Sequence, residues 1–419
     1  MPRSAHRTAL LLPAAAVLAT LSACGGGSSS TSPAPLVIAV LAPTSADPYL
    51  AQTLHRGTDL AMRELNAGGG VSIGGSKRHV ELRTYDDGLD AQRTRSAVQS
   101  AIHDGAAGIV TDGYGAAAAA QDSAAAGVPI IVINNGDATL MDPKARPSLF
   151  RIGIANDAAT SILSKYVAQS AKAPAIVHDD TDYGRDGATQ LQQALPTAGL
   201  HPTTTLEIAK DVPAVDAQVR AVLDAHSDAL IVWGTDTFVA RVVSAAHTAS
   251  ASLPVFTGPT GESPAVRAVA GADATEGLRF IDSRTTSESD SVSFGQFEHR
   301  LAAAAGGPTD AGVKDREGRA IRLPADGEVF SYDAVNLLAA AAGKLGSVQP
   351  SSKLVDLMTQ TRVHSANGDA RGFNPDNHEG VADDDLYIAR IHDMQFAPVK
   401  DEALSATLPS EDQILANFH

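Results

Sequence analysis

The chain is poor in several residue types, and each shortage narrows what the protein can do. Its 419 residues include one cysteine, Cys24, so a disulfide framework and a thiolate metal site are excluded. Lys and Arg number 32 against 48 Asp and Glu, and the formal net charge is −16. An acidic chain without basic clusters is a poor partner for nucleic acid or anionic lipid. Beyond the N-terminal region, no stretch approaches the roughly 20 apolar residues of a membrane-spanning helix.

The first 35 residues have the order of an export signal followed by a linker. Basic residues precede a short apolar run from Ala9 to Thr20, and small residues follow it. The tetrapeptide Leu21-Ser22-Ala23-Cys24 resembles a bacterial lipobox, which is cleaved just before a cysteine that carries lipid. We therefore predict a signal peptide over residues 1–23, a lipidated Cys24, and a flexible Gly/Ser/Thr/Pro linker over residues 24–35.

From residue 36 onward, short apolar runs alternate with longer helical stretches. Uninterrupted apolar runs are typical of strands that are buried on both faces of a parallel sheet. The predicted strands are Leu36–Leu41, Val80–Tyr85, Gly108–Thr111, Pro129–Ile133, Ala175–His178, Ala229–Trp233 and Pro254–Thr257. The predicted helices are Pro48–Asn66, Asp90–Asp104, Ala116–Ala126, Asp157–Ala171, Gly184–Ala198, Val215–His226 and Thr237–Ala249. This alternation predicts an α/β fold with doubly wound parallel sheets.

One sheet would need too many strands, so we predict two lobes joined by chain crossings. Phe150–Ile154 is the first predicted crossing, with Asn156-Asp157 as the N-cap of the next helix, and Leu278–Ser283 is the second. We expect residues 36–154 and 283–365 in lobe 1, residues 155–282 and 366–398 in lobe 2, and a surface tail over residues 399–419. We also expect an exposed loop over residues 306–327, a helix over Glu328–Lys344 and a final strand over Asp385–Arg390.

Short motifs follow one another along the chain from about residue 36 to 395. They are Ala42-Pro43-Thr44-Ser45, Asn66-Ala67-Gly68-Gly69-Gly70, Tyr85-Asp86-Asp87, Asp182-Tyr183-Gly184, Thr257-Gly258-Pro259, Thr275-Glu276-Gly277-Leu278, Ser331-Tyr332-Asp333-Ala334 and Gly372-Phe373-Asn374. In this order and spacing they resemble the type I periplasmic binding proteins, in the branch that feeds branched-chain amino acid ABC transporters. The resemblance implies two lobes with a three-segment hinge that closes on a small solute.

The first candidate for ligand binding is the turn Gly113-Tyr114-Gly115-Ala116, which follows a predicted strand and opens an alanine-rich helix. Glycines allow close backbone approach, and the first helical N–H groups can bind an anion. The resemblance implies that this turn holds a ligand carboxylate, although the serine hydroxyl common in relatives is missing. A nicotinamide-binding Gly-x-Gly-x-x-Ala fingerprint and a plain tight turn are the alternatives.

Further candidates come from both lobes. Asn134-Asn135-Gly136 ends a predicted strand, where it offers amide groups to a polar ligand or simply forms a turn. The resemblance places the Tyr183 ring on the ligand from lobe 2. Tyr49, in the first turn of the first predicted helix, completes these candidates.

The acid that pairs with a ligand ammonium in relatives is replaced by Thr260. Asp236 and Glu262 are the two nearby acids that could substitute for it. Thr260 also suits a neutral ligand, because an unpaired buried acid would cost several kcal/mol. The sequence leaves these alternatives open.

Neither a nucleophile elbow nor a set of metal ligands is visible, so we predict no catalytic residue, metal site or cofactor. We expect a monomeric, lipid-anchored solute-binding protein of an ABC uptake system. Its partners would be a small polar solute, such as an amino acid or amide, and a membrane permease. It would lie in the cell envelope on the periplasmic or extracytoplasmic face, and Gly25 after the cysteine resembles an outer-membrane sorting pattern. The alternative is an envelope lipoprotein of the same fold that contacts a protein partner or acts as a sensor.

Overall fold

The computed structural model describes residues 33–283, 292–305, 310–314, 318, 320–322, 326–368 and 370–399. The predicted signal peptide, the lipidated Cys24 and the linker up to residue 32 lie outside these residues, as does the predicted tail beyond Val399. Within the part of the chain that the structure describes, no helix is long and apolar enough to cross a membrane.

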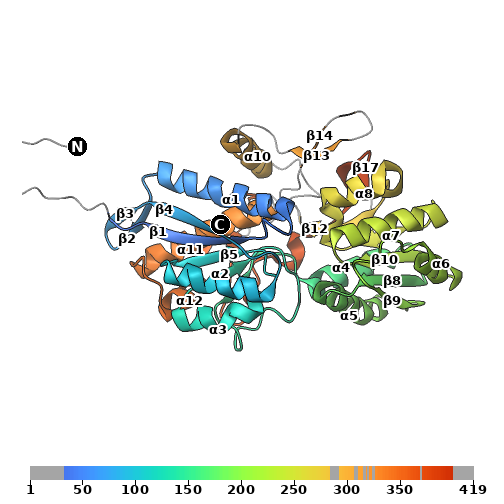
Figure 1. The fold of residues 1–419 in the computed structure, drawn as a ribbon, viewed down its shortest axis with the longest axis horizontal. Coiled ribbons are helices and arrows are strands. Elements are labelled where there is room, and N and C mark those ends of the chain that lie inside the picture. Colours follow the sequence, from blue (N-terminus) through green and yellow to red (C-terminus); the bar gives the residue numbers. More distant parts are fainter. Residues whose placement is uncertain are drawn as a thin grey trace, which may run out of the picture. The chain divides into compact units, whose positions relative to one another are not determined.

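Lobe 1 is built on a parallel five-stranded sheet in the order β4-β1-β5-β6-β7 (Figure 1). Its strands are β1 (Leu36–Ala42), β4 (Val80–Asp86), β5 (Gly108–Thr111), β6 (Ile130–Val132) and β7 (Leu149–Arg151). Its helices are α1 (Pro48–Ala67), α2 (Ala91–His103), α3 (Ala116–Ala126), α10 (Val292–Ala305), α11 (Asp326–Leu345) and α12 (Ser352–Met358). Two hairpins are attached, β2–β3 (Val71–Ile73, Ser76–Arg78) and β15–β16 (Arg362–His364, Ala370–Gly372).

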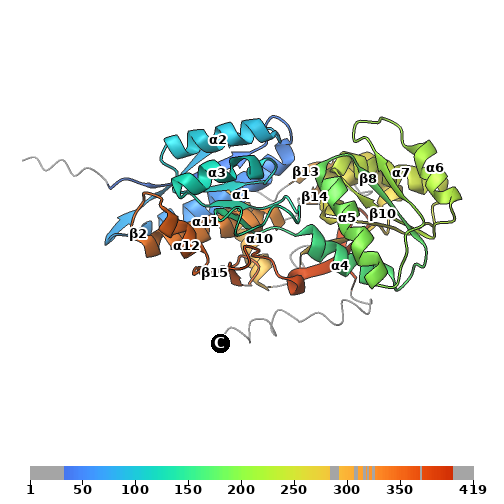
Figure 2. The same ribbon diagram turned by 90° about the horizontal axis from the view of Figure 1, so that it is seen from below.

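Both faces of the lobe 1 sheet are covered, which explains why β1 is apolar throughout. Ile38 and Val40 pack in a core cluster with side chains of α1 and α11. Their neighbours Ala39 and Leu41 pack in a second cluster with side chains of α2 and α3. Because successive strand residues point to opposite faces, a sheet buried on both sides needs apolar residues at every position. Figure 2 shows α2 and α3 on the side of the sheet opposite α11 and α12.

Lobe 2 is built on a seven-stranded sheet in the order β18-β17-β12-β11-β10-β8-β9. Its strands are β8 (Pro174–Asp179), β9 (Thr205–Ile208), β10 (Ala229–Trp233), β11 (Val255–Thr257), β12 (Arg279–Ser283), β17 (Leu386–His392) and β18 (Gln395–Pro398). Its helices are α4 (Asn156–Val167), α5 (Asp182–Thr197), α6 (Asp216–Asp224), α7 (Asp236–Ala249), α8 (Pro264–Thr275) and the 3₁₀ turn η1 (Pro259–Glu262). Side chains of α4 and α5 cover one face and those of α6, α7 and α8 the other. Strands β17 and β18 run antiparallel to their neighbours, whereas the other strands are parallel.

The predicted α/β fold with parallel sheets in two lobes is confirmed. Strands Gly108–Thr111 and Ala229–Trp233 and helix Ala116–Ala126 have the predicted bounds, and the other predicted strands and helices differ by a few residues at their ends. The assignment of residues to lobes stays a prediction. Ala366 and Phe373, which we expected in lobe 2, pack in the core cluster of lobe 1.

Several predictions of local structure are wrong. Asp385–Arg390 is not the final strand, because β17 turns back into β18. The stretch 306–327 contains two short paired strands, β13 (Asp310–Lys314) and β14 (Ala320–Arg322), and the start of α11. The predicted crossings stay predictions, and each includes residues of a sheet strand, since Leu149–Arg151 and Arg279–Ser283 pair with neighbours as β7 and β12. These segments are short, and a short run can be a strand as well as a connection.

The predicted N-cap Asn156-Asp157 is also displaced by one position. Ala155 is the N-cap of α4, and Asn156 is the first helical residue. The Asn156 side chain instead donates to the Asp186 carboxylate at 2.8 Å. A tertiary contact has therefore replaced the local capping bond.

Candidate functional site

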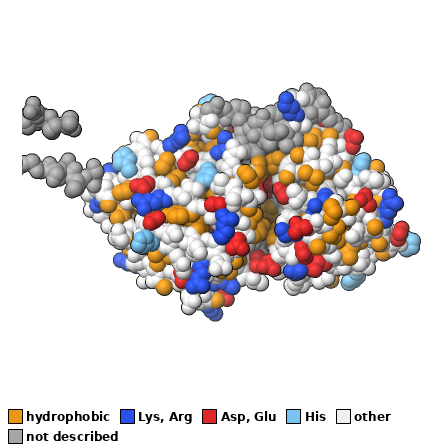
Figure 3. Space-filling view, viewed as in Figure 1, with side chains coloured by type: hydrophobic (Ala, Val, Ile, Leu, Met, Phe, Trp, Pro, Cys, Tyr) orange, Lys and Arg blue, Asp and Glu red, His pale blue; other side chains and the backbone are white. Residues whose placement is uncertain are grey.

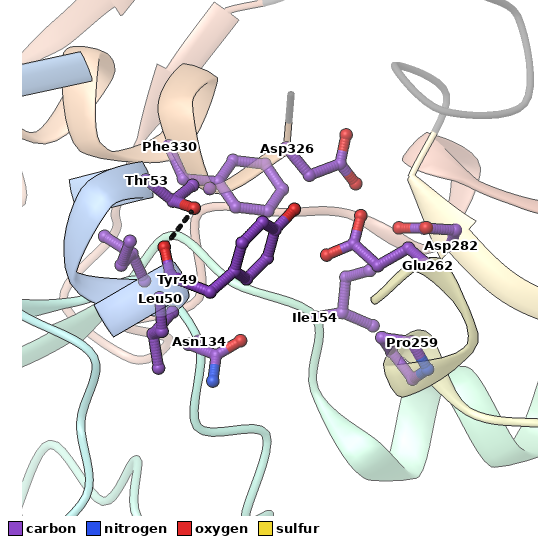
Figure 4. Close-up of a pocket in the computed structure, with 12 residues that line it drawn as sticks. Tyr49, Leu50, Thr53, Asn134, Ile154, Pro259, Glu262, Asp282, Asp326 and Phe330 are labelled. Carbon is purple, nitrogen blue, oxygen red and sulfur yellow. Dashed lines mark hydrogen bonds between the residues drawn. The ribbon is translucent and has the colours of Figure 1, made fainter. Parts of the chain in front are cut away.

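A cavity lies between the two lobes and has walls from both (Figure 4). It holds about 510 Å³ of space not filled by protein atoms, part of it open to solvent. Lobe 1 contributes side chains from α1, the end of β6 and α11, and lobe 2 contributes side chains from η1 and β12. The lining residues are Tyr49, Leu50, Thr53, Ile133, Asn134, Ile154, Pro259, Glu262, Asp282, Asp326, Gly327 and Phe330.

The start of α1 positions Tyr49 at this cavity. Asp47 caps the helix, because its carboxylate accepts from the N–H groups of Tyr49 and Leu50 at 3.1 and 3.0 Å. Pro48 occupies the first helical turn, where a missing N–H costs nothing. The Thr53 hydroxyl then donates to the Tyr49 carbonyl at 3.1 Å, as the dashed line in Figure 4 shows. Sequence-local chemistry thus fixes the backbone from which the Tyr49 side chain projects.

Helix α1 packs closely against the first residues of α11. A Cβ on Gly57 of α1 would lie 2.1 Å from the Glu328 carbonyl oxygen of α11, so only glycine fits at this position. This contact places Tyr49 and Asp326 on the same wall of the cavity.

Three carboxylates from separate elements meet at one end of the cavity. Glu262 ends η1, Asp282 lies in β12, and Asp326 is the first residue of α11. One carboxylate oxygen from each lies within 4.8 Å of those of the other two. Asp282 and Asp326 are buried, with 1% and 2% of their surface exposed, and Glu262 is half-buried. Figure 4 shows the three groups turned toward one another.

Burial of Glu262 and Asp282 favours the neutral forms of these two acids. Burial raises the pKa of Glu262 well above its usual range, and the nearby charge of Asp326 raises it further. Burial and the charge of Glu262 do the same for the pKa of Asp282. The charge of Arg267 opposes this shift for Glu262, and burial lowers the pKa of Arg267 itself to about 10. Ionisation of Glu262 and Asp282 is therefore unfavourable unless a positively charged group approaches them.

Three of the predicted ligand-binding residues line the cavity: Tyr49, Asn134 and Glu262. Sequence reasoning missed Asp282 and Asp326, which lie at the end of a strand and at the start of a helix. Neither belongs to a local motif that would mark it. Asp282 lies within the predicted crossing Leu278–Ser283 and Asp326 within the predicted loop 306–327, so no local signal marked either acid.

The turn Gly113-Tyr114-Gly115-Ala116 does not line the cavity. Gly113 and Gly115 both have positive φ values of 102° and 80°, as a tight turn into a helix requires. The Tyr114 N–H donates to Asp112 at 2.7 Å, and the Gly113 N–H donates to Thr111 at 3.2 Å. Two amides of the predicted anion site are therefore engaged within the turn itself.

A second group of predicted residues gathers next to the core of lobe 2. The Tyr114 ring reaches across from lobe 1 and packs against that core. Burial raises the pKa of Tyr114 well above its usual range, and electrostatic repulsion from the neighbouring Tyr183 raises it further. The Tyr183 hydroxyl is 3.3 Å from the Thr260 hydroxyl, and the Tyr183 ring lies 6.0 Å from the Trp233 ring. Asp236 accepts from the Ser263 hydroxyl at 3.1 Å, so one of its oxygens is engaged within lobe 2.

The loop Asn134-Asn135-Gly136 is held by a buried arginine. Arg151 donates to the carbonyl oxygen of Asn135 at 2.9 Å and pairs with the Glu379 carboxylate at 2.5 Å. Arg151 is 1% exposed, and Glu379 belongs to the chain segment that follows β16. The loop beside the cavity is therefore tied to a distant part of the chain.

Among the described residues on the face in Figure 3, there is no continuous basic area that would suit a polyanion. On the face in Figure 3, Lys and Arg side chains lie among Asp and Glu side chains, and hydrophobic side chains line a hollow near the middle. The formal net charge of −16 agrees with this pattern. A small molecule held in the cavity suits these features better than nucleic acid.

Comparison with known proteins assigns the fold and the family. The family model described as periplasmic binding protein matches residues 35–395. A type 1 periplasmic binding protein from Bordetella pertussis Tohama I is similar, with 21% identity, a TM-score of 0.74, and coverage of 85% of this chain and 97% of that one. The substrate-binding protein LivJ of a branched-chain amino acid transporter from Streptococcus pneumoniae, solved with isoleucine, has 20% identity, a TM-score of 0.73 and coverage of 86% and 97%.

A third structure is the solute-binding protein of an ABC transporter from Rhodopseudomonas palustris BisB5, solved with 3,4-dihydroxybenzoic acid. It has 18% identity, a TM-score of 0.69 and coverage of 87% of this chain and 96% of that one. A comparison with curated protein sequences finds no match. At these identities the structural matches establish the fold, whereas the family model covers most of the chain.

Proposed function

Because the chain belongs to the periplasmic binding protein family, whose members bind solutes rather than catalyse reactions, we propose that it captures a small polar solute between its lobes for an ABC transporter. The single observation that carries this proposal is the cavity lined from both lobes, with Tyr49 and Asn134 on one side and Glu262 on the other. Similar folds have been solved with isoleucine and with 3,4-dihydroxybenzoic acid, which are both small and polar.

The mechanism that suits this architecture is capture followed by closure. A solute that contacts both lobes stabilises the form in which they are together, in proportion to its extra contacts in that form. Micromolar affinity corresponds to about −8 kcal/mol after the costs of closure and ordering. The closed form would then be recognised by the permease.

Solute binding is tested with protein that has been unfolded, dialysed and refolded to remove any copurified ligand. We expect a panel of amino acids, amides, amines and small carboxylates to contain at least one solute that releases heat and raises the melting temperature. The single tryptophan, Trp233, is fully buried and lies beside Tyr183, so its fluorescence offers a second readout. If no solute releases heat or raises the melting temperature, the proposal is wrong. That result would support the alternative of an envelope lipoprotein that binds a protein partner.

We further propose that Cys24 carries the lipid that anchors the protein at the cell envelope. Several acyl chains, at about 0.8 kcal/mol per buried methylene, would make the anchor lasting. Cys24→Ser should move the protein from the membrane fraction to the soluble fraction while solute binding is retained. A variant that stays with the membrane would contradict the anchor, and one that loses binding would contradict a purely tethering role.

A further inference from the structure

The three carboxylates of Glu262, Asp282 and Asp326, called here the acid cluster, lack sufficient partners of their own. Glu262 Oε2, Asp282 Oδ2 and both carboxyl oxygens of Asp326 are buried and accept no N–H or hydroxyl hydrogen bond from the described residues. Their nearest polar neighbours are one another's carboxyl groups. Buried acids are normally paired or hydrogen-bonded, because an unpaired one costs several kcal/mol. A group that supplies positive charge or N–H donors would satisfy these atoms.

The described cations near the acid cluster are already engaged elsewhere. Arg267 donates to the carbonyl oxygens of Met394 and Glu262 at 3.0 and 3.2 Å, and its guanidinium stacks on the Phe396 ring at 4.2 Å. Arg56 pairs with Glu328 at 2.7 Å. Among the described residues, neither donates a hydrogen bond to a carboxylate of the acid cluster, although the charge of Arg267 favours the ionised form of Glu262. The acid cluster therefore still lacks a direct N–H donor.

Tyr49 provides an independent sign that a ligand belongs at this place. Its hydroxyl is buried, with less than 1 Å² exposed, and it has no hydrogen-bond partner among the described residues. Figure 4 shows this hydroxyl directed toward Glu262, which belongs to the opposite lobe. Buried tyrosine hydroxyls usually find a partner. The space between Tyr49 and the acids is therefore polar on both sides.

The walls of the rest of the cavity favour an organic cation over a bare metal ion. Ca²⁺ takes six to eight oxygen ligands, and Mg²⁺ takes six in a near-octahedral arrangement. Leu50, Ile133, Ile154, Pro259 and Phe330 line much of the remaining wall and offer no side-chain oxygen, whereas Thr53 and Asn134 offer one each. Apolar walls with a few convergent polar groups are typical of sites for small organic ligands. Aromatic rings such as those of Tyr49 and Phe330 also attract a cationic nitrogen.

We propose that the cavity binds a small organic solute with a positively charged nitrogen, which docks against Glu262, Asp282 and Asp326 while the apolar walls hold the solute's body. This inference rests on the proposed function and narrows its substrate class to amines and related cations. It also resolves the open question at Thr260: the ammonium would pair with acids from both lobes instead of a single acid at that position. Because Asp326 belongs to lobe 1 and Glu262 to lobe 2, one cation would join the two lobes.

Calorimetry on ligand-stripped protein tests the substrate class with a matched series. The probes are pentylamine, 1,5-diaminopentane and leucinamide as cations, pentanol as a neutral analogue, pentanoate as an anion, leucine as a zwitterion, and Ca²⁺ and Mg²⁺ alone. We expect the organic cations to bind at least about tenfold more tightly than pentanol and pentanoate, since charge-assisted hydrogen bonds would be lost with the latter.

Three other outcomes would each contradict the inference, and the measurements tell them apart. If neutral or anionic solutes bind as tightly as the cations, the substrate class is wrong and the proposed function stands. If Ca²⁺ or Mg²⁺ binds and no organic cation does, the acid cluster is a metal site. If nothing in this series and nothing in the wider solute panel binds, the proposed function fails together with the inference.

Substitutions separate a binding role of the acid cluster from a structural one. Asp326→Asn and Asp282→Asn should each weaken binding of the tightest organic cation by about tenfold to a hundredfold. Their melting temperatures without ligand should equal or exceed that of the unmodified protein, because repulsion among buried acids is relieved. Glu207→Gln, which removes an exposed acid of lobe 2, is the matched control and should bind normally. Lower melting temperatures with unchanged affinity would show that the acid cluster is structural, and the inference would be wrong.

Discussion

Glu328 shows how a single buried acid makes the stability of this protein depend on pH. Its carboxylate is 1% exposed and pairs with Arg56 at 2.7 Å. Burial raises the pKa of Glu328 to about 7, although the pair with Arg56 opposes this shift. In the unfolded chain the pKa of a glutamate is near its ordinary value of about 4.3. The folded protein therefore binds the proton more tightly, and the contribution of Glu328 to stability falls as the pH rises from about 4.3 to about 7.

Glu328→Gln should remove this pH dependence, because glutamine resembles the protonated acid and cannot ionise. The melting temperature of the variant, relative to that of the unmodified protein, should rise between pH 5 and pH 8. Thermal unfolding measured by circular dichroism at several pH values checks this. Glu207→Gln is the control, since the pair with Arg185 lowers the pKa of Glu207 and predicts no such gain. A difference between Glu328→Gln and the unmodified protein that is constant with pH would contradict the assignment.

At the scale of elements, the short β15–β16 hairpin depends on an ion pair with α11. A two-stranded hairpin is marginal by itself in water. Arg371 of β16 is 1% exposed, donates to the Asp385 carboxylate at 2.7 Å and lies 3.6 Å from the Asp333 carboxylate of α11. Asp333 also accepts from the Ser365 hydroxyl and the Ala366 N–H, which connect the helix to the hairpin. Arg371 is thus a charged link between the strand, the helix and the following segment.

Arg371→Met should destabilise the protein by about 3–5 kcal/mol, because it leaves two buried acids without their cation. The free energy of unfolding from urea denaturation measures this loss. Arg185→Met serves as the comparison, since its pair with Glu207 is exposed on the surface and should leave the stability nearly unchanged. Equal stabilities for the two variants would show that the Arg371 link contributes little.

The elements that could be predicted from the sequence are those buried on both faces. Gly108–Thr111 and Ala229–Trp233 are continuous apolar runs because helices cover both sides of their sheets. The edge strand Thr205–Ile208 is only partly buried, so its sequence has no such run and it was missed. The site was predicted in part for a related reason. Tyr49, Asn134 and Glu262 adjoin recognisable motifs, whereas Asp282 and Asp326 converge only through the fold.

At the scale of the whole molecule, the contacts that cross between the lobes determine how easily the cavity opens. Asp186 of α5 in lobe 2 accepts from the Ala138 N–H in the loop after β6 of lobe 1, at 3.2 Å. The same carboxylate accepts from Asn156 at 2.8 Å and from Gln190 at 3.1 Å, and both of these donors belong to lobe 2. The side chain is thus held in place by its own lobe and reaches the other lobe with one bond. Such a bond stabilises the form in which the lobes are together, with or without a solute.

Asp186→Ala should therefore weaken solute binding by about threefold to tenfold, the factor that corresponds to one net hydrogen bond. The radius of gyration of the unliganded protein, measured by small-angle X-ray scattering, should rise, because the form with the lobes together loses a contact that favours it. Gln190→Ala is the matched control, since it removes a bond to the same carboxylate within lobe 2 and leaves the bond to Ala138 in place. Unchanged affinity and unchanged scattering in Asp186→Ala would show that closure does not depend on this contact. The acid cluster would then remain the main link that a solute makes between the lobes, because Asp326 and Glu262 approach the cavity from opposite sides.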